Sequence, residues 1–216
     1  MQYIDVVKYS RSIGIAGFLS VSTTTAFAET KSFDFSGFDE VSIAAGIEAE
    51  ILLAEEYSVV AETTEEEMER LLVSVKGETL VVSRKTPSIT WGQRDRVNVS
   101  ISLPMLEGVS VSSGAQVVAN KIDASDFGIS VSSGGFLNAD GSCDALDLDV
   151  SSGGRIDATK LDCADARADA SSGGSAELSA SESVSAKASS GGSIVVNGKP
   201  EKIHKRVSSG GNISIR

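Results

Sequence analysis

The chain has 216 residues, of which 41% are hydrophobic and only 5% aromatic, and its formal net charge is −11. This composition fits one repeat-rich domain and excludes a disordered chain. The negative charge argues against partners such as nucleic acid and anionic lipid surfaces, which would repel the protein.

The first 28 residues have the features of a secretory signal peptide. Lys8 and Arg11 form a basic start, residues 13–21 are a short apolar run, and Ala26–Ala28 matches an A-x-A cleavage site. The apolar run is too short to span a bilayer, and no later segment is a candidate membrane span. We therefore expect an exported protein whose mature chain starts at residue 29.

Residues 29–108 are predicted to form a β-rich N-terminal section, because apolar and polar residues alternate in short runs. The Thr64–Glu67 segment matches a capping box and predicts one short helix that continues to Leu72. We expect this section to cap the first coil of the region that follows it. The strand-like segments are residues 33–43, 47–53, 57–61, 73–75, 80–82 and 97–103.

Residues 109–216 are organised by a repeated SSGG tetrapeptide, with SSGA as a variant. Successive copies are 20, 19, 20, 18 and 19 residues apart, and the runs between them alternate like strands. A unit of about 19 residues cannot bury its apolar face alone, so successive units must stack. The predicted fold is all-β, a parallel β-helix or solenoid with coils of about 19 residues. The copies start at Ser112, Ser132, Ser151, Ser171, Ser189 and Ser208.

Each tetrapeptide is predicted to form a corner between two strands, where the glycines adopt positive φ without steric cost. Counting the alternation forward from Val150 places the second serine of each copy on the inward side. We therefore expect an internal ladder of serines, with a surface array for ligand binding as the alternative. The corner residues are Ser113, Gly114, Ser133, Gly134, Ser152, Gly153, Ser172, Gly173, Ser190, Gly191, Ser209 and Gly210.

The two cysteines occupy the same column of adjacent coils. Cys143 lies eight residues before Ser151, and Cys163 lies eight residues before Ser171. Stacked strands bring such residues to about 5 Å, which a disulfide accepts. Because an exported protein meets an oxidising compartment, we expect a disulfide between Cys143 and Cys163, with a stacked pair of free thiols as the alternative.

Several segments together resemble a known family, the putative autotransporter adhesin head GIN domain, which is a domain of unknown function in exported bacterial proteins. The resemblance covers about residues 33–216 and implies a right-handed β-helix-like fold in the cell envelope, at the periplasm or the cell surface. It implies no catalytic residues. The segments are Phe33–Val41, Tyr57–Val59, Gly77–Leu80, Val99–Pro104 and the serial Ser-Gly repeats.

Acidic residues on the outward strand positions are the strongest candidates for chemistry. Asp147, Asp149, Asp165 and Asp169 could stack on one face, as the sites of β-helix lyases and hydrolases require. Arg167 aligns with Asp147 in the next coil, which predicts a charge pair across coils. We expect a solvated charged face, with a weak Ca²⁺ site and catalysis as the alternatives.

Other candidates give little support for a reaction. His204 is the only histidine, and no nucleophile-elbow motif is present, so we expect it to be an ordinary surface residue. Trp91 and Tyr57 are the only plausible aromatic platform for a carbohydrate. We expect no cofactor, and no metal beyond the weak Ca²⁺ possibility.

The sequence therefore favours an exported, non-enzymatic β-solenoid that acts as a surface adhesion or binding module for a glycan or a protein. One alternative is a carbohydrate-active lyase or hydrolase that uses the acidic faces. Another is a structural subunit of an envelope assembly that stacks through its final coil. The ligand and the oligomeric state stay open.

Overall fold

A computed structural model describes residues 29–85 and 95–216, so the predicted signal peptide and Trp91 lie outside the described residues. Within these ranges the chain forms fifteen strands and one short helix. The elements are β1 Glu29–Phe33, β2 Glu40–Ile43, β3 Glu48–Leu53, β4 Ser58–Thr63, α1 Glu65–Arg70, β5 Leu71–Lys76, β6 Thr79–Arg84, β7 Asn98–Leu103, β8 Gly108–Val111, β9 Gln116–Val131, β10 Phe136–Val150, β11 Arg155–Ala170, β12 Ser175–Ala188, β13 Ser193–Asn197, β14 Lys202–Val207 and β15 Asn212–Ile215.

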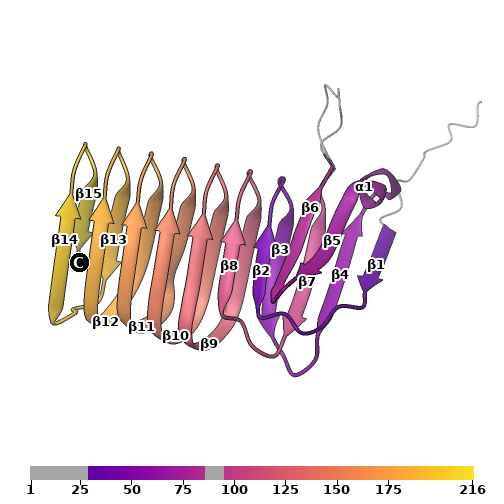
Figure 1. Cartoon of the computed structure of the whole chain (residues 1–216), viewed down its shortest axis with the longest axis horizontal. Coiled ribbons are helices and arrows are strands. Elements are labelled where there is room, and N and C mark those ends of the chain that lie inside the picture. The colour runs from indigo at the N-terminus through magenta and orange to yellow at the C-terminus, as the bar shows by residue number, and fades with distance from the viewer. Residues whose placement is uncertain (1–28, 86–94) are drawn as a thin grey trace, which may run out of the picture.

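The strands wind into stacked parallel coils with two flat faces (Figure 1). The front face consists of β2, β8, the second halves of β9 to β12, and β14. The back face consists of β3, the first halves of β9 to β12, β13 and β15. The predicted β-solenoid is therefore confirmed.

The two edges of the solenoid differ. The SSGG corners line the upper edge in Figure 1, and each long strand bends from the back face to the front face at the lower edge. Register shifts between neighbouring coils occur near this bend, for example between Asn138 and Asp140. The repeat length varies from 18 to 20 residues, and the extra residues are accommodated at the lower edge.

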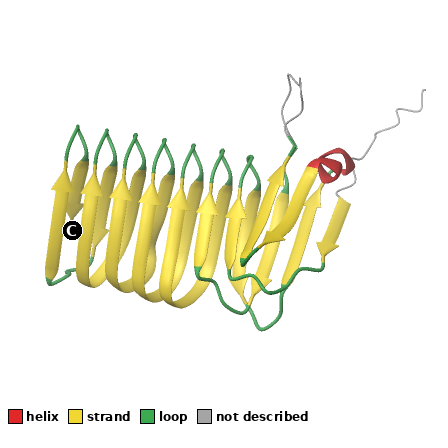
Figure 2. Cartoon of the chain, in the orientation of Figure 1, coloured by secondary structure: helices red, strands yellow, loops and turns green. Residues whose placement is uncertain are grey.

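The N-terminal section continues the solenoid. β2 and β3 form a coil against β8 and β9, and their corner at residues 44–47 has positive φ at Ala45 and Gly46. On the other side of this coil lie β6 and β7, also parallel to it. Antiparallel strands then close both faces: β5 borders the front, β4 and β1 border the back, and α1 connects the two layers (Figure 2).

The core lies between the faces and consists of columns of inward side chains. Along one front-face column the side chains shrink from Leu148 to Ala168 and Ala186. Lys205 takes the next place in this column, and all six residues of β14 are exposed. A charge at an inward position discourages unwanted pairing of an edge strand.

The corner geometry corrects one sequence prediction. The second serine and the first glycine both have positive φ, as in Ser152 (49°) and Gly153 (71°), and both are exposed. The Gly154 N–H donates to the Ser151 carbonyl at 2.8 Å, which closes a type I′ turn. The predicted internal serine ladder is therefore wrong, because the turn takes this serine out of the strand alternation and points it to solvent.

The second glycine of each complete SSGG copy is required for a different reason. A Cβ at Gly154 would lie 2.7 Å from the Val131 carbonyl oxygen of the preceding coil. At Gly153 nothing lies within 4 Å of that position. The first glycine is therefore needed for its φ, and the second for the close approach of two backbones.

The helix forms where it was predicted, but the capping box does not. The Thr64 hydroxyl makes no capping hydrogen bond and instead donates to Asp95 at 3.2 Å. The helix also ends at Arg70, two residues earlier than expected, because Leu71 adopts the extended backbone of β5.

Hydrogen bonds join the corners of neighbouring coils, and at the N-terminal end an arginine held by a buried ion pair replaces the missing backbone donor. In the SSGG corners, the first glycine donates its N–H to the next coil, as Gly153 does to the Ser172 carbonyl at 3.3 Å. The Ala45 carbonyl of the first corner instead accepts a 2.7 Å hydrogen bond from Arg84 Nε. Arg84, on β6, also forms an ion pair with buried Glu67, on α1, at 3.0 Å. This ion pair holds the arginine side chain in place to donate to the Ala45 carbonyl.

Candidate functional site

The front face carries a groove of about 850 Å³, which runs along the solenoid axis across five successive coils. A row of inward apolar residues forms its floor, and a row of outward residues borders it on each side. The floor residues are Phe127, Leu146, Ala166, Val184 and Ile203. The lower row is Asp126, Ala145, Asp165, Ser183 and Lys202, and the upper row is Gly128, Asp147, Arg167, Ser185 and His204.

Small residues in the two bordering rows keep the groove open. Ala145, Ser183 and Ser185 add little bulk, and Gly128 adds no side chain. The neighbouring Gly108 pairs with Gly128 in register and also lacks the positive φ that would require glycine. The groove therefore follows from which residues occupy the outward positions of otherwise regular strands.

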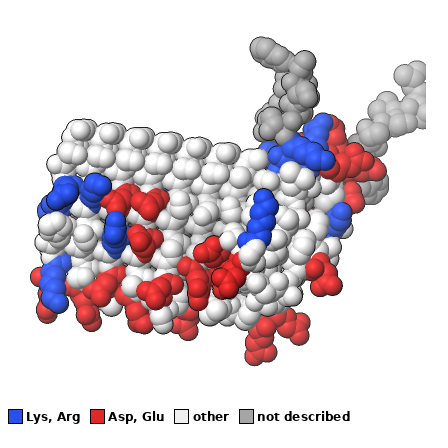
Figure 3. Space-filling model, in the orientation of Figure 1, with Lys and Arg blue, Asp and Glu red and all other residues white. Residues whose placement is uncertain are grey.

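The groove has opposite charges at its two ends. Glu40, Glu107 and Asp126 line the end near β8, and Lys202 and His204 line the end at β14. In Figure 3, basic side chains lie on the C-terminal coils and again toward the N-terminal end of this view, with acidic ones between them and along the lower edge. The residues that line the groove are thus acidic at one end and basic at the other.

The four aspartates singled out in the sequence lie in or beside this groove. Asp147 and Asp165 line it, and Asp149 and Asp169 pair in register just above it. Burial raises the pKa of Asp149, and the nearby carboxylates of Asp169 and Asp147 raise it further against the opposing effect of Arg167. Two stacked carboxylates make the uncharged form of one of them more favourable.

The predicted charge pair between Asp147 and Arg167 does not form, although the two residues are partners in register. Arg167 instead pairs with Asp169 on its own strand at 3.5 Å, and Lys187 approaches the same carboxylate at 3.8 Å. Asp169 contacts both cations because Arg167 lies two residues away on the same strand and Lys187 is its register partner in the next coil. Asp165 accepts a hydrogen bond from the Ser183 hydroxyl.

The geometry offers little for a metal or a triad. Among residues 29–85 and 95–216, no three His, Cys, Asp or Glu side chains gather as a metal site would require. His204 is exposed at the basic end of the groove. Tyr57, one of the two proposed aromatic platforms, packs against buried Phe38 with 5.0 Å between ring centres, so it is part of the core contact.

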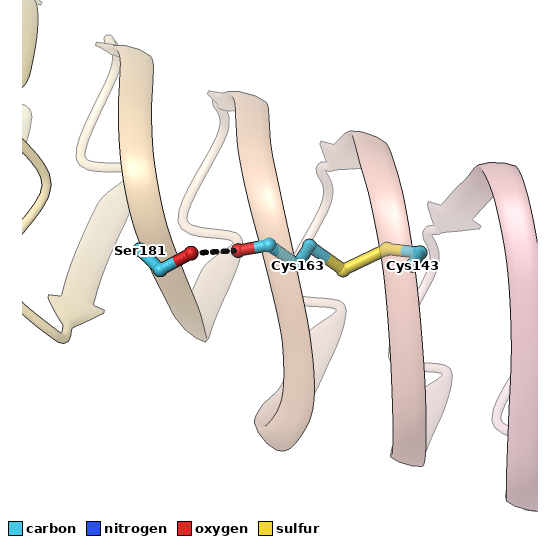
Figure 4. Close-up of a disulfide and its surroundings, with 3 residues drawn as sticks. All are labelled: Cys143, Cys163 and Ser181. Carbon is cyan, nitrogen blue, oxygen red and sulfur yellow. Dashed lines mark hydrogen bonds between the residues drawn. A yellow bond between two sulfur atoms is a disulfide. The ribbon is translucent and has the colours of Figure 1, made fainter.

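Cys143 and Cys163 lie directly opposite each other in neighbouring coils, where the long strands bend at the lower edge. The structure joins them in a disulfide with a Cα–Cα distance of 4.5 Å, and both residues are buried (Figure 4). The Ser181 hydroxyl donates to the Cys163 carbonyl at 3.4 Å and continues the contact into the next coil. This bridge connects coils and lies apart from the groove-lining residues.

Sequence reasoning identified the acidic residues but missed the groove. The available signal was the pair Gly108 and Gly128, which lie within front-face strands and outside any corner. A glycine inside a strand often marks a place where another molecule or backbone approaches closely. The described residues also contain no helix that is long and apolar enough to cross a membrane.

Solved structures share this fold at low sequence identity. A putative adhesin from Bacteroides fragilis matches with a TM-score of 0.70 and 18% identity, over 88% of this chain and 97% of that one. A putative lipid binding protein from Parabacteroides distasonis matches with a TM-score of 0.53 and 17% identity, over 89% and 98%. A putative adhesin from Parabacteroides merdae matches with a TM-score of 0.53 and 14% identity, over 89% and 97%.

No curated protein matches the sequence. The model of one family, described as "Putative auto-transporter adhesin, head GIN domain", matches residues 37–200. This match covers most of the chain and confirms the resemblance seen in the sequence, so the chain belongs to the head GIN domain family of putative auto-transporter adhesins.

Proposed function

We propose that this protein is an exported, non-enzymatic binding module of the cell envelope or cell surface, and that the front-face groove holds its ligand. The groove carries the proposal. It is a hollow of about 850 Å³ that combines charged borders with the small residues Ala145 and Gly128 and the exposed apolar side chain of Ile203. Ligand sites commonly join a concave apolar surface with a few polar groups that fix orientation.

Four further observations support the proposal. The family is described as an adhesin, and adhesion is a surface function. The first 28 residues have the pattern of a secretory signal. Among the groove-bordering residues Ser183 donates a hydrogen bond to Asp165, but no hydrogen bond joins a histidine to this pair, which favours binding over turnover. The repeat supplies a rigid scaffold, because every coil is hydrogen-bonded to its neighbours.

The test is a screen of the purified protein on glycan and peptide arrays, with Ca²⁺ and with a chelator. The matched variants are Asp147→Lys in the groove and Glu177→Lys, which is exposed on the back face. We expect intact ligand to bind to the wild type and to the back-face variant, and to bind weakly to the groove variant. Binding that both variants retain would contradict the groove as the site.

A carbohydrate-active enzyme is the second candidate, and one observation favours it. Asp149 has a raised pKa and stands beside Asp169, and glycosidases use a pair of carboxyl groups of which one stays protonated. Mass spectrometry of the array ligands decides between the two functions. Cleaved oligosaccharide, lost in Asp149→Asn, would replace the binding proposal with an enzymatic one.

A further inference from the structure

The polarity of the groove restricts the chemistry of its ligand. From the Asp126 coil to the Lys202 coil there are four coil steps, which at about 4.8 Å each span about 19 Å. An extended polypeptide covers that length with about six residues at about 3.3 Å per residue. The groove is thus long enough for a short peptide segment that lies across the strands.

A polymer of uniform charge does not match the groove. An anionic chain would meet the carboxylates of the β8 end and those of Asp147 and Asp165 farther along the groove, and a cationic chain would meet Lys202 at the β14 end. Like charges in close contact are unfavourable, and complementary charges select one partner and one register. The fitting ligand carries basic groups at one end and acidic groups at the other.

A neutral glycan fits the groove less well. Carbohydrate sites use the exposed faces of aromatic rings, and Phe127, the one aromatic residue among those that line the groove, is 2% exposed. A divalent cation is also disfavoured, since no three ligand side chains come together among the described residues. Polypeptide is the common polymer that carries both signs of charge on an extended backbone with apolar side chains between them.

Gly128 is a second observation that points to a ligand, independent of charge. Its φ is not positive, and a Cβ there would meet only the Glu107 carbonyl oxygen at 3.7 Å, an ordinary contact. The fold therefore does not require glycine at this place, and glycine weakens a strand. Its effect is to leave the groove floor free for close approach by another chain.

We propose that the groove binds an extended segment of a partner polypeptide, with basic residues over the β8 end and acidic residues over the β14 end. This inference rests on the proposed function and names the class of ligand. The middle of the segment lies over the backbone of the buried floor residues and against the exposed side chain of Ile203, and the charged borders set its direction.

The probe is a fluorescent octapeptide with two lysines at one end, two glutamates at the other, and serine and valine between them. Its control is a peptide of the same composition with alternating charges. Fluorescence anisotropy at low salt should show at least tenfold tighter binding of the polar peptide to the wild-type protein. Equal binding of the two peptides would overturn the inference, because polarity is its basis.

Two variants separate recognition from folding. Gly128→Thr should weaken binding of the polar peptide at least tenfold while its melting temperature stays the same or rises, because threonine favours strands. Asp147→Lys should weaken binding at least tenfold, and Glu177→Lys on the back face should not. Unchanged binding in Gly128→Thr would overturn the inference.

A neutral hexasaccharide in the same assay distinguishes failure of the peptide inference from failure of the proposal that the groove is a binding site. If it binds at the groove and the polar peptide does not, the peptide inference fails and the groove remains a binding site. If neither probe binds and the array screen is silent, both proposals fail.

Discussion

The second glycine of each SSGG corner should be the least replaceable residue of the repeat, and Gly154→Ala tests this directly. Its Cβ would lie 2.7 Å from the Val131 carbonyl oxygen and 3.0 Å from the Ser151 carbonyl oxygen. Both are backbone atoms that cannot rotate away. The Val131 carbonyl also accepts the hydrogen bond from the Ser151 N–H at 3.0 Å that stacks the two coils.

The matched variant is Gly153→Ala, one residue earlier. Nothing lies near its Cβ, so the cost comes from its φ of +71° alone, about 1–2 kcal/mol for a left-handed residue. Overpacking a well-packed site costs about 1–3 kcal/mol and occasionally more. We expect Gly154→Ala to reach about 3 kcal/mol or more, because relief requires the two coils to separate and weakens their hydrogen bond.

Urea denaturation followed by circular dichroism measures both variants against the wild type. The account predicts that Gly154→Ala lowers the unfolding free energy clearly more than Gly153→Ala does. If Gly153→Ala were the more damaging of the two, or if both were neutral, the explanation of the corner by close backbone approach would be refuted.

Three further changes test the coil stacking and the charges. Replacing both Cys143 and Cys163 with alanine should lower the unfolding free energy by about 3 kcal/mol, because the disulfide joins residues that are 20 positions apart. Adding reductant to the wild type should lower its urea midpoint to about that of the double variant. A wild-type midpoint that does not respond to reductant would indicate free thiols. Arg84→Met should cost about 1–3 kcal/mol, because buried Glu67 loses its 3.0 Å partner and keeps only Arg70 at 3.4 Å. A loss below about 1 kcal/mol in urea denaturation would contradict the cap. Asp149→Asn should raise the unfolding free energy at pH 7, since the raised pKa of Asp149 means that the fold disfavours its ionised form. The gain should vanish near pH 3, where the aspartate is protonated in both the folded and the unfolded state. A gain of equal size at both pH values would show that the ionisation of Asp149 is not its cause.

Much of the architecture could be predicted from the sequence because the repeat determines it. The even spacing of SSGG and the alternation between copies are sufficient for stacked coils, and the equal offsets of Cys143 and Cys163 place them opposite each other. Stacking also puts Asp149 beside Asp169. These relations depend on counting residues between corners, which a sequence provides.

The sequence predictions were wrong where the local backbone geometry interrupts the strand alternation. Two successive residues with positive φ reverse the chain at Ser152 and Gly153, so alternation from Val150 cannot be continued through the corner. The first corner, at residues 44–47, lacks serine and could be recognised only from Ala45 and Gly46 between alternating runs.

The groove could not be predicted because it depends on several coils at once. Each bordering row collects one residue from each of five coils. The ion-pair partner of Arg167 could not be predicted for a similar reason. The strand register places Arg167 opposite Asp147, but its side chain bends to Asp169 on its own strand.

The most direct test of the central claim, that the front-face groove is the ligand site, is a map of backbone amide chemical shifts with the tightest ligand from the arrays. The account predicts shifts at groove residues such as Gly128, Ala145 and Ser185, and unchanged amides at Val118 and Glu177 on the back face. Shifts confined to the back face or to the SSGG corners would contradict it.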